Sequence, residues 1–226
     1  RRDGSSKFGA NNKWGTFPTV AAGWNLTNQP FLSDVRWLNQ LKLRASYGVA
    51  GNQEIGEYRS IVVWEPSGKA TNPETGQEVI TFKPAWNANP NLKWEETAEV
   101  NVGIDFSIFN SQISGSLEVY QKTTTDLLGE YNVPVPPNLA SKTFANSGSM
   151  ENMGIELYVQ AFPLKSKVLD WKTSLTVAHN QTKITDLGDY FEEGAVRKEG
   201  YVDGRGMVGE ENYVTGIMVG EATGAF

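Results

Sequence analysis

The stretch from Thr97 to Ile108 decides the fold, and it reads TAEVNVGIDFSI. Every second residue is apolar, and the residues between are polar, charged or glycine. Because side chains on a β-strand alternate between two faces, this period of two predicts a strand with one apolar and one polar face. The stretch is longer than the about 5–6 residues of an average soluble strand and suits the about 9–11 residues of a membrane-crossing strand. Its apolar face consists of Ala98, Val100, Val102, Ile104, Phe106 and Ile108.

Five other stretches alternate in the same way, and none of the six apolar faces carries Asp, Glu, Lys or Arg. The sequence therefore predicts an all-β protein built on an antiparallel sheet. A soluble β-sandwich alternates too, so this pattern alone leaves a sandwich open beside a membrane barrel. The five stretches are 17–26, 41–49, 112–122, 155–161 and 171–180.

The connections between these strands alternate in length. Residues 109–111 and 162–170 form short links, whereas 50–96 and 123–154 are long, polar and rich in Gly and Pro. Short turns at one rim and long loops at the other are typical of outer-membrane barrels, so the connections favour a transmembrane barrel. Aromatic residues at the strand ends fit an interfacial girdle, and they are Trp24, Phe31, Trp37, Phe109, Phe162 and Trp171.

Composition excludes several functions. The 226 residues carry a net charge of -6, which argues against nucleic acid as a partner because phosphate binding needs a basic surface. The chain has no cysteine and one histidine, so zinc-thiolate sites, multi-histidine metal sites and cysteine catalysis are excluded. We expect this histidine, His179, to lie near the end of an apolar face, at a membrane rim. We predict no catalytic residue, no metal site and no cofactor, and therefore no enzyme.

Three further patterns resemble functional motifs but lack their context. Gly204–Gly209 reads G-x-G-x-x-G without an apolar strand before it, so we expect a flexible loop there. The adjacent glutamates at 95–96 and 192–193 point opposite ways on a strand, unlike the facing carboxylates of a glycosidase. The acidic residues at 186–193 lack the spacing of a calcium loop, so we expect a solvated loop.

Several blocks of the sequence form a recognisable series. They include FPTVAAGW at 17–24, LKLRASYG at 41–48, NPNLKWE at 89–95, YQKTTTDLL at 120–128 and NSGSMENMGIE at 146–156. This series resembles the SusC/RagA family of TonB-dependent outer-membrane transporters. The resemblance covers nearly the whole chain in order, and the combination of blocks is specific.

The resemblance implies that residues 1–226 are one partial β-barrel domain, an antiparallel segment of a transmembrane barrel of about 22 strands. The plug domain, the TonB box and the last strands are expected to be absent from this segment. By the same resemblance, the complete protein lies in the bacterial outer membrane and imports oligosaccharides or peptides. Its implied partners are outer-membrane lipid, the cargo, a SusD-like surface lipoprotein that acts as a lid, and the TonB complex, which acts through the plug.

The long loops and the polar faces supply the candidate contacts. Aromatic rings in the loops can stack on sugar rings or pack against a lid. These candidates are Tyr58, Trp64, Trp86 and Tyr131. The polar faces carry charges of both signs, which suits neutral polar cargo, and we favour pairing among these side chains over pairing with a plug. They are Lys42, Arg44, Glu99, Asp105, Glu118, Lys122 and Lys172.

Two other classes stay open from the residues alone. A soluble carbohydrate-binding or adhesin β-sandwich would bury its apolar faces against one another in a compact monomer. A β-rich secreted hydrolase is disfavoured by the single histidine and by the lack of facing carboxylates.

Overall fold

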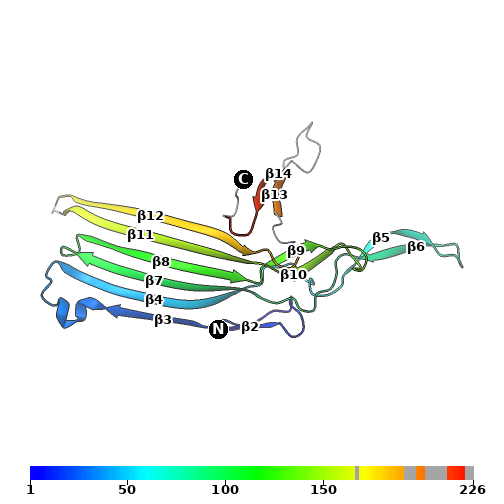
Figure 1. The fold of residues 1–226 in the computed structure, drawn as a ribbon, viewed down its shortest axis with the longest axis horizontal. Helices are drawn as coiled ribbons and strands as arrows, with labels where there is room; N and C mark the ends of the chain where they lie inside the picture. Colours follow the sequence, from blue (N-terminus) through cyan, green and yellow to red (C-terminus); the bar gives the residue numbers. More distant parts are fainter. Residues whose placement is uncertain (166–167, 191–196, 202–212, 222–226) are drawn as a thin grey trace.

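An open sheet of six antiparallel strands forms the main body of the chain (Figure 1). The structure is a computed structural model, and it describes residues 1–165, 168–190, 197–201 and 213–221. The spatial order of the strands is β12-β11-β8-β7-β4-β3. Their bounds are β3 (Thr19–Asn25), β4 (Leu38–Asn52), β7 (Glu95–Ile108), β8 (Ile113–Thr125), β11 (Ser149–Lys165) and β12 (Asp170–Asp186).

Smaller elements lie at the two ends of this sheet. Two 3-10 turns, η1 (Leu26–Asn28) and η2 (Pro30–Leu32), join β3 to β4. Four two-stranded hairpins occupy the opposite end of the sheet in the part of the chain that the structure describes (Figure 1). No helix in this part is both long and apolar enough to cross a membrane. The hairpin strands are β1 (Arg2–Gly4), β2 (Trp14–Thr16), β5 (Trp64–Thr71), β6 (Glu78–Pro84), β9 (Leu128–Asn132), β10 (Lys142–Asn146), β13 (Arg197–Tyr201) and β14 (Tyr213–Ile217).

The apolar stretches of the sequence all lie on the same face of the sheet. The register aligns Leu43 of β4 with Ile104 of β7, and Ile104 with Leu117 of β8. Leu117 aligns with Leu157 of β11, which aligns with Val177 of β12. An apolar row therefore crosses five neighbouring strands, and the prediction of a sheet with one apolar and one polar face is confirmed.

This apolar face has no second layer over it in the described residues. Val102, Val119 and Leu175 are exposed to 51%, 52% and 58%. In a sandwich such side chains would be buried against an opposing sheet, so the sandwich alternative is wrong for this chain. A long, uncovered apolar face is what the lipid-facing wall of a membrane barrel requires. β3 and β12 form the two edges of the sheet, so the described strands do not close a barrel.

The limit of the apolar face runs obliquely across the sheet. On β4 and β7 the apolar side chains continue to Val49 and Ala98, which pair with each other. On β12 the apolar side chains end at Val177. Through the register, Val177 aligns with Ile104 of β7, which lies farther from the hairpins than Ala98. Barrel strands tilt by about 35–45° from the membrane normal, and such a tilt shifts the membrane boundary from strand to strand in this way.

The end with the short connections carries a constrained turn. Phe109, Asn110 and Ser111 have φ angles of 54°, 53° and 63°, a region that L-residues enter at a cost. The backbone N–H of Ser111 donates to Oδ1 of Asn39 at 3.0 Å, and the N–H of Phe109 donates to the Trp37 carbonyl at 2.8 Å. The predicted girdle residues gather at this end, and those with exposed side chains are Trp24, Phe31, Trp37, Phe109 and Trp171.

The end with the long connections is a folded cap, whereas the sequence predicts long polar loops there. We define the cap as residues 1–18, 53–94 and 126–148. Its core is a cluster of five buried side chains, in which the Trp94 ring lies 5.1 Å from Phe8 and 5.3 Å from Phe17. The connections are also shorter than predicted, because the ladders of the sheet continue to Asn52 and Thr125. The core residues are Phe8, Phe17, Leu92, Trp94 and Phe144.

Candidate functional site

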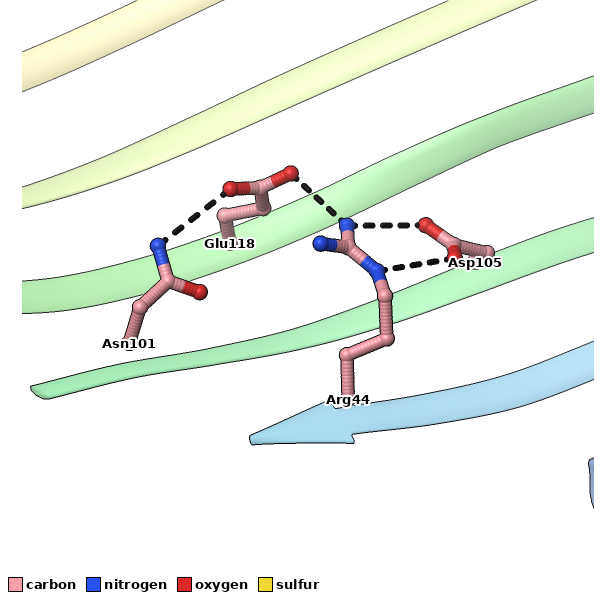
Figure 2. A network of polar contacts seen from close by, with 4 residues as sticks. All are labelled: Arg44, Asn101, Asp105 and Glu118. Carbon is pink, nitrogen blue, oxygen red and sulfur yellow. Dashed lines mark hydrogen bonds and ion pairs between the residues drawn. The ribbon is translucent and has the colours of Figure 1, made fainter. Parts of the chain in front are cut away.

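The polar face of the sheet carries a network of four side chains from three neighbouring strands (Figure 2). Arg44 donates from Nε and Nη2 to the two carboxylate oxygens of Asp105, at 2.8 and 2.9 Å. Its Nη2 also donates to Oε1 of Glu118 at 2.7 Å. Asn101 donates from Nδ2 to Oε2 of the same glutamate at 3.4 Å. Two carboxylates surround one guanidinium, so the network carries one net negative charge.

The strand register builds this network. Arg44 pairs with Gly103, which pairs with Glu118, so the three positions form one row across β4, β7 and β8. Gly103 lets the guanidinium cross β7, because a Cβ at this position would lie 3.1 Å from Nη2 of Arg44. The sequence does not single out Gly103 or Asn101 as site residues. Only the cross-strand register reveals their part in the network.

The network is suited to holding charge rather than to chemistry. The side chains of Arg44, Asp105 and Glu118 are 34%, 28% and 29% exposed, so water reaches each of them. A bidentate arginine–carboxylate pair is among the stronger polar contacts and fixes geometry as well as charge. The guanidinium of Arg44 occupies both oxygens of Asp105 and one oxygen of Glu118, whose other oxygen accepts from Asn101. The arrangement therefore ties three strands together and presents carboxylate oxygens to the inner side of the sheet.

A second polar layer lies nearer the cap. Nζ of Lys122 lies 3.5 Å from Oε2 of Glu99 and 4.9 Å from the ring centroid of Tyr120. The Tyr120 ring fills the space that a side chain at Gly154 would need. The Tyr120 ring and the Lys122–Glu99 ion pair therefore belong to the same polar surface as the Arg44 network.

Most of the charges predicted to pair on this face do pair with one another. Lys42 and Lys172 are the exceptions, since neither has an ion-pair partner within the described ranges. The confirmed members are Arg44, Glu99, Asp105, Glu118 and Lys122.

Two of the four aromatic candidates are freely accessible. Tyr58, in the segment before β5, is 63% exposed, and Trp64, at the start of β5, is 60% exposed. The β5–β6 hairpin extends away from the sheet (Figure 1), and Trp64 pairs with Pro84 at the open end of this hairpin. Their contact with cargo or a lid stays a prediction.

The other two aromatic candidates are packed within the chain. The Trp86 indole N–H donates to the Ile61 carbonyl at 3.0 Å. Tyr131 is buried, its hydroxyl donates to the Ser147 carbonyl at 3.0 Å, and its ring stacks on Tyr190 at 4.4 Å. In this conformation these rings support the cap, and any contact with cargo also stays a prediction.

The remaining sequence motifs do not form a chemical site in the described residues. His179 lies on the apolar face of β12, in register with Ile155, as predicted. Glu95 accepts a hydrogen bond from the Asn52 side chain at 3.0 Å, while Glu96 is on the opposite side of β7. No group of three metal-ligating side chains occurs in the described part of the chain. Residues 192–193 and 204–209 lie outside the described residues.

Comparison with known proteins places this architecture in a family. The family described as TonB dependent receptor-like, beta-barrel matches residues 1–207. TonB-dependent receptor P39 of Formosa agariphila is 39% identical over 97% of this chain and 20% of its own length. TonB-dependent receptor SusC of Bacteroides thetaiotaomicron is 36% identical over 85% of this chain and 20% of its own length.

Solved structures agree with this assignment. The RagAB peptide transporter is 28% identical, with a TM-score of 0.72 over 84% of this chain and 20% of that chain. The RagAB peptide importer in its open-open state is 26% identical, with a TM-score of 0.76 over 95% of this chain and 21% of that chain.

This chain spans about 20% of the length of the curated relatives that it matches. Its apolar outer face, its polar inner face and its alternating connections are those of a barrel wall in the bacterial outer membrane. The family match covers most of the chain, and SusC and RagA relatives match it over most of its length. The chain belongs to the TonB-dependent receptor-like β-barrel family, within its SusC/RagA group.

Proposed function

We propose that this chain is part of the wall of a TonB-dependent importer that carries oligosaccharides or peptides across the outer membrane. The single observation that carries the proposal is the uncovered apolar face on one side of the sheet, with ion pairs on the other. An apolar outside and a polar inside are what a water-filled passage through lipid requires. The RagAB relatives, named as a peptide transporter and a peptide importer, and SusC support the transport role.

Residues 1–226 act in this proposal as one part of a larger barrel domain. The edges at β3 and β12 pair with further strands of the same barrel, which leaves no open hydrogen-bonding edge in lipid. A plug domain with a TonB-contacting segment, supplied by other parts of the protein, transmits the pull of the TonB complex. The net negative charge of the Arg44 network faces the space that such a plug would occupy.

A SusD-like surface lipoprotein is the proposed partner at the cap. Long loops face the exterior in outer-membrane barrels, so the β5–β6 hairpin stands where a lid would meet the barrel. The register puts Trp64 opposite Pro84 and Pro66 opposite Phe82, all on one face of the hairpin. Trp64 and Phe82 are exposed, and exposed aromatic rings in one place are typical of protein interfaces.

The proposed cargo contacts are Tyr58 and Trp64, whose rings are exposed in the cap. Trp86 and Tyr131 contribute to cargo binding in this proposal by holding the segments that carry the exposed rings. The protein transports its cargo unchanged, with no enzymatic step and no cofactor.

Import is tested by deleting the gene from its native host and supplying single oligosaccharides or peptides as the growth source. The deletion strain should lose growth on one class of cargo and regain it with the intact gene. The full-length protein should also require detergent for extraction and should retain a surface lipoprotein during purification. Unchanged growth on every cargo of both classes, with a protein that is soluble without detergent, would contradict the proposal.

A further inference from the structure

Arg59 lies in a notch between two aromatic rings of the cap. Its Cζ is 4.1 Å from the ring centroid of Trp86 and 4.3 Å from that of Phe144. The two rings are 5.8 Å apart and at 87° to each other, so the guanidinium rests against both. Aromatic faces attract a cation through their quadrupole, and the rings therefore hold the guanidinium in one place.

Both rings are themselves fixed by the surrounding cap. Phe144 is buried in the cap core, and its carbonyl accepts a hydrogen bond from the Asn89 side chain at 2.8 Å. The Trp86 indole N–H donates to the carbonyls of Ile61 and Tyr58, on either side of Arg59 in the sequence. The notch is built from three separate segments, so it is preformed rather than a chance contact of a surface side chain.

Arg59 has no anionic partner within the described part of the chain. Its Nε is the one buried side-chain nitrogen or oxygen there without a hydrogen bond, and the residue as a whole is half-buried. Two other cations of the cap are paired, since Lys93 lies 2.7 Å from Asp126 and Lys142 lies 2.6 Å from Glu130. A guanidinium has five N–H donors and no acceptor. The unpaired donors of Arg59 can therefore bind an anion.

The segment before Arg59 is shaped around the guanidinium. A Cβ at Gly56 would lie 2.7 Å from Nε of Arg59, so a larger residue there would displace the guanidinium. Tyr58 has a φ of 62°, which costs energy for a tyrosine and is found in binding and active sites. Tyr58, which precedes Arg59 in the sequence, has an exposed ring. Strain, an unpaired donor and an exposed ring thus coincide in one short segment.

We propose that Arg59 and Tyr58 form a carboxylate-binding site in the cap. The guanidinium donates to both oxygens of a carboxylate, a geometry that arginine matches with two parallel hydrogen bonds. The Tyr58 ring covers the part of the ligand next to that carboxylate. Arg44 of the inner face is no substitute, because its guanidinium already binds Asp105 and Glu118. The proposed import function supplies the source of the ligand, which is the carboxylate of a peptide or of a uronic acid in an oligosaccharide.

The test uses the full-length protein in detergent and two matched pairs of probes. One pair is a short peptide with a free C-terminal carboxylate and the same peptide amidated. The other is an oligogalacturonate and its methyl ester. In calorimetry, the wild-type protein should bind the carboxylate member of one pair about tenfold more tightly than its neutral partner. R59Q should abolish this preference and leave the affinity for the neutral probe unchanged.

A matched control removes another positive charge from the cap. K69Q breaks an exposed ion pair with Glu78, at 2.8 Å in the β5–β6 hairpin, and it should keep the full preference. R59K keeps the charge without the planar fork and should keep only part of the preference. If R59Q does not show the heat-modifiable gel mobility of a folded barrel, R59K is used in its place for the test.

Each outcome decides the proposal. A preference limited to the peptide pair, or to the uronate pair, identifies the source of the carboxylate. Equal binding of charged and neutral probes by the wild type overturns the site, and so does an equal loss for both probes in R59Q, which indicates packing alone. Cargo-dependent growth without a carboxylate preference refutes this inference only, whereas a preference without growth dependence refutes import only.

Discussion

The sheet and the cap of this chain follow opposite rules of packing. In the sheet, apolar side chains such as Val102 point outward and stay exposed, while Arg44 and its carboxylates lie inside. In the cap, Phe8 and Leu92 are buried to 2% and 0% exposure, as in a water-soluble protein. The difference teaches that the surrounding solvent decides where apolar side chains go. Hydrocarbon keeps the apolar side chains of the sheet away from water, and the buried core does the same for those of the cap.

The largest effect that tests this comparison is expected from Trp94→Ala in the cap. Trp94 is 6% exposed, packs against two phenylalanine rings and donates from Nε1 to the Lys13 carbonyl at 3.2 Å. Truncation of a buried tryptophan costs about 3–5 kcal/mol. Hydrogen exchange of the full-length protein should show faster exchange in the cap and unchanged protection in β7 and β8.

Trp14→Ala is the matched control, because Trp14 also lies in the cap but is 65% exposed. Its effect should stay within about 0.5 kcal/mol. Equal losses in the two variants would mean that the cap has no core of its own.

A charge on the outer face of the sheet should have the next largest effect. Leu117 lies in the middle of the apolar row, and Leu117→Arg should lower the free energy of unfolding in lipid vesicles by about 2–4 kcal/mol. Ser116→Arg is the control, since Ser116 faces the polar side and lies opposite Asp105. Urea unfolding of the vesicle-inserted protein measures both. If Ser116→Arg proved the more harmful, the two faces would be assigned the wrong way round.

The sequence predicts the sheet well because its signal is local. Alternation over Thr97–Ile108 needs only neighbouring residues, and the predicted faces match those of the structure. Alternation does not set the strand ends, because ladders continue past the last apolar residue, as β4 does to Asn52. The cap core escapes prediction, since Phe8, Leu92 and Phe144 come from distant segments that follow no period.

The candidate site is predictable in kind but not in detail. The mixed charges of the inner face predict mutual pairing, and Arg44 does pair with Asp105 and Glu118. Which residues pair depends on the register of strands that are 61 and 74 positions apart in sequence. Arg59 shows the same limit, because nothing near it in sequence reveals that Trp86 and Phe144 form its notch.

A medium effect is expected from Arg44→Gln on the inner face. The substitution leaves Asp105 and Glu118 without their shared cation, and water only partly replaces it because both are about a third exposed. The expected loss is about 1–2 kcal/mol, well below that for a charge placed in lipid. Urea unfolding of the full-length protein measures it, with Lys42→Gln on the same face as a control.

A double-mutant cycle separates the pair from the background. Arg44→Gln combined with Asp105→Asn should cost less than the sum of the two single variants, because either one already breaks the bidentate contact. If the losses of the two single variants simply added up in the double variant, Arg44 and Asp105 would have no coupling energy. The backbone ladders would then hold these strands together without the ion pair.

The smallest effect is expected at the turn between β7 and β8, which belongs to neither the sheet face nor the cap. Asn110 has a φ of 53°, where glycine is free of strain and asparagine is among the better tolerated residues. Asn110→Gly should therefore raise the free energy of unfolding by only about 0.5 kcal/mol, since relief of strain is partly offset by a more flexible unfolded chain. Asn110→Val should lower it, because a branched side chain fits this region poorly. A stabilising valine would mean that the turn leaves the left-handed conformation in lipid, and that the hydrogen bond from Ser111 to Asn39 does not hold it.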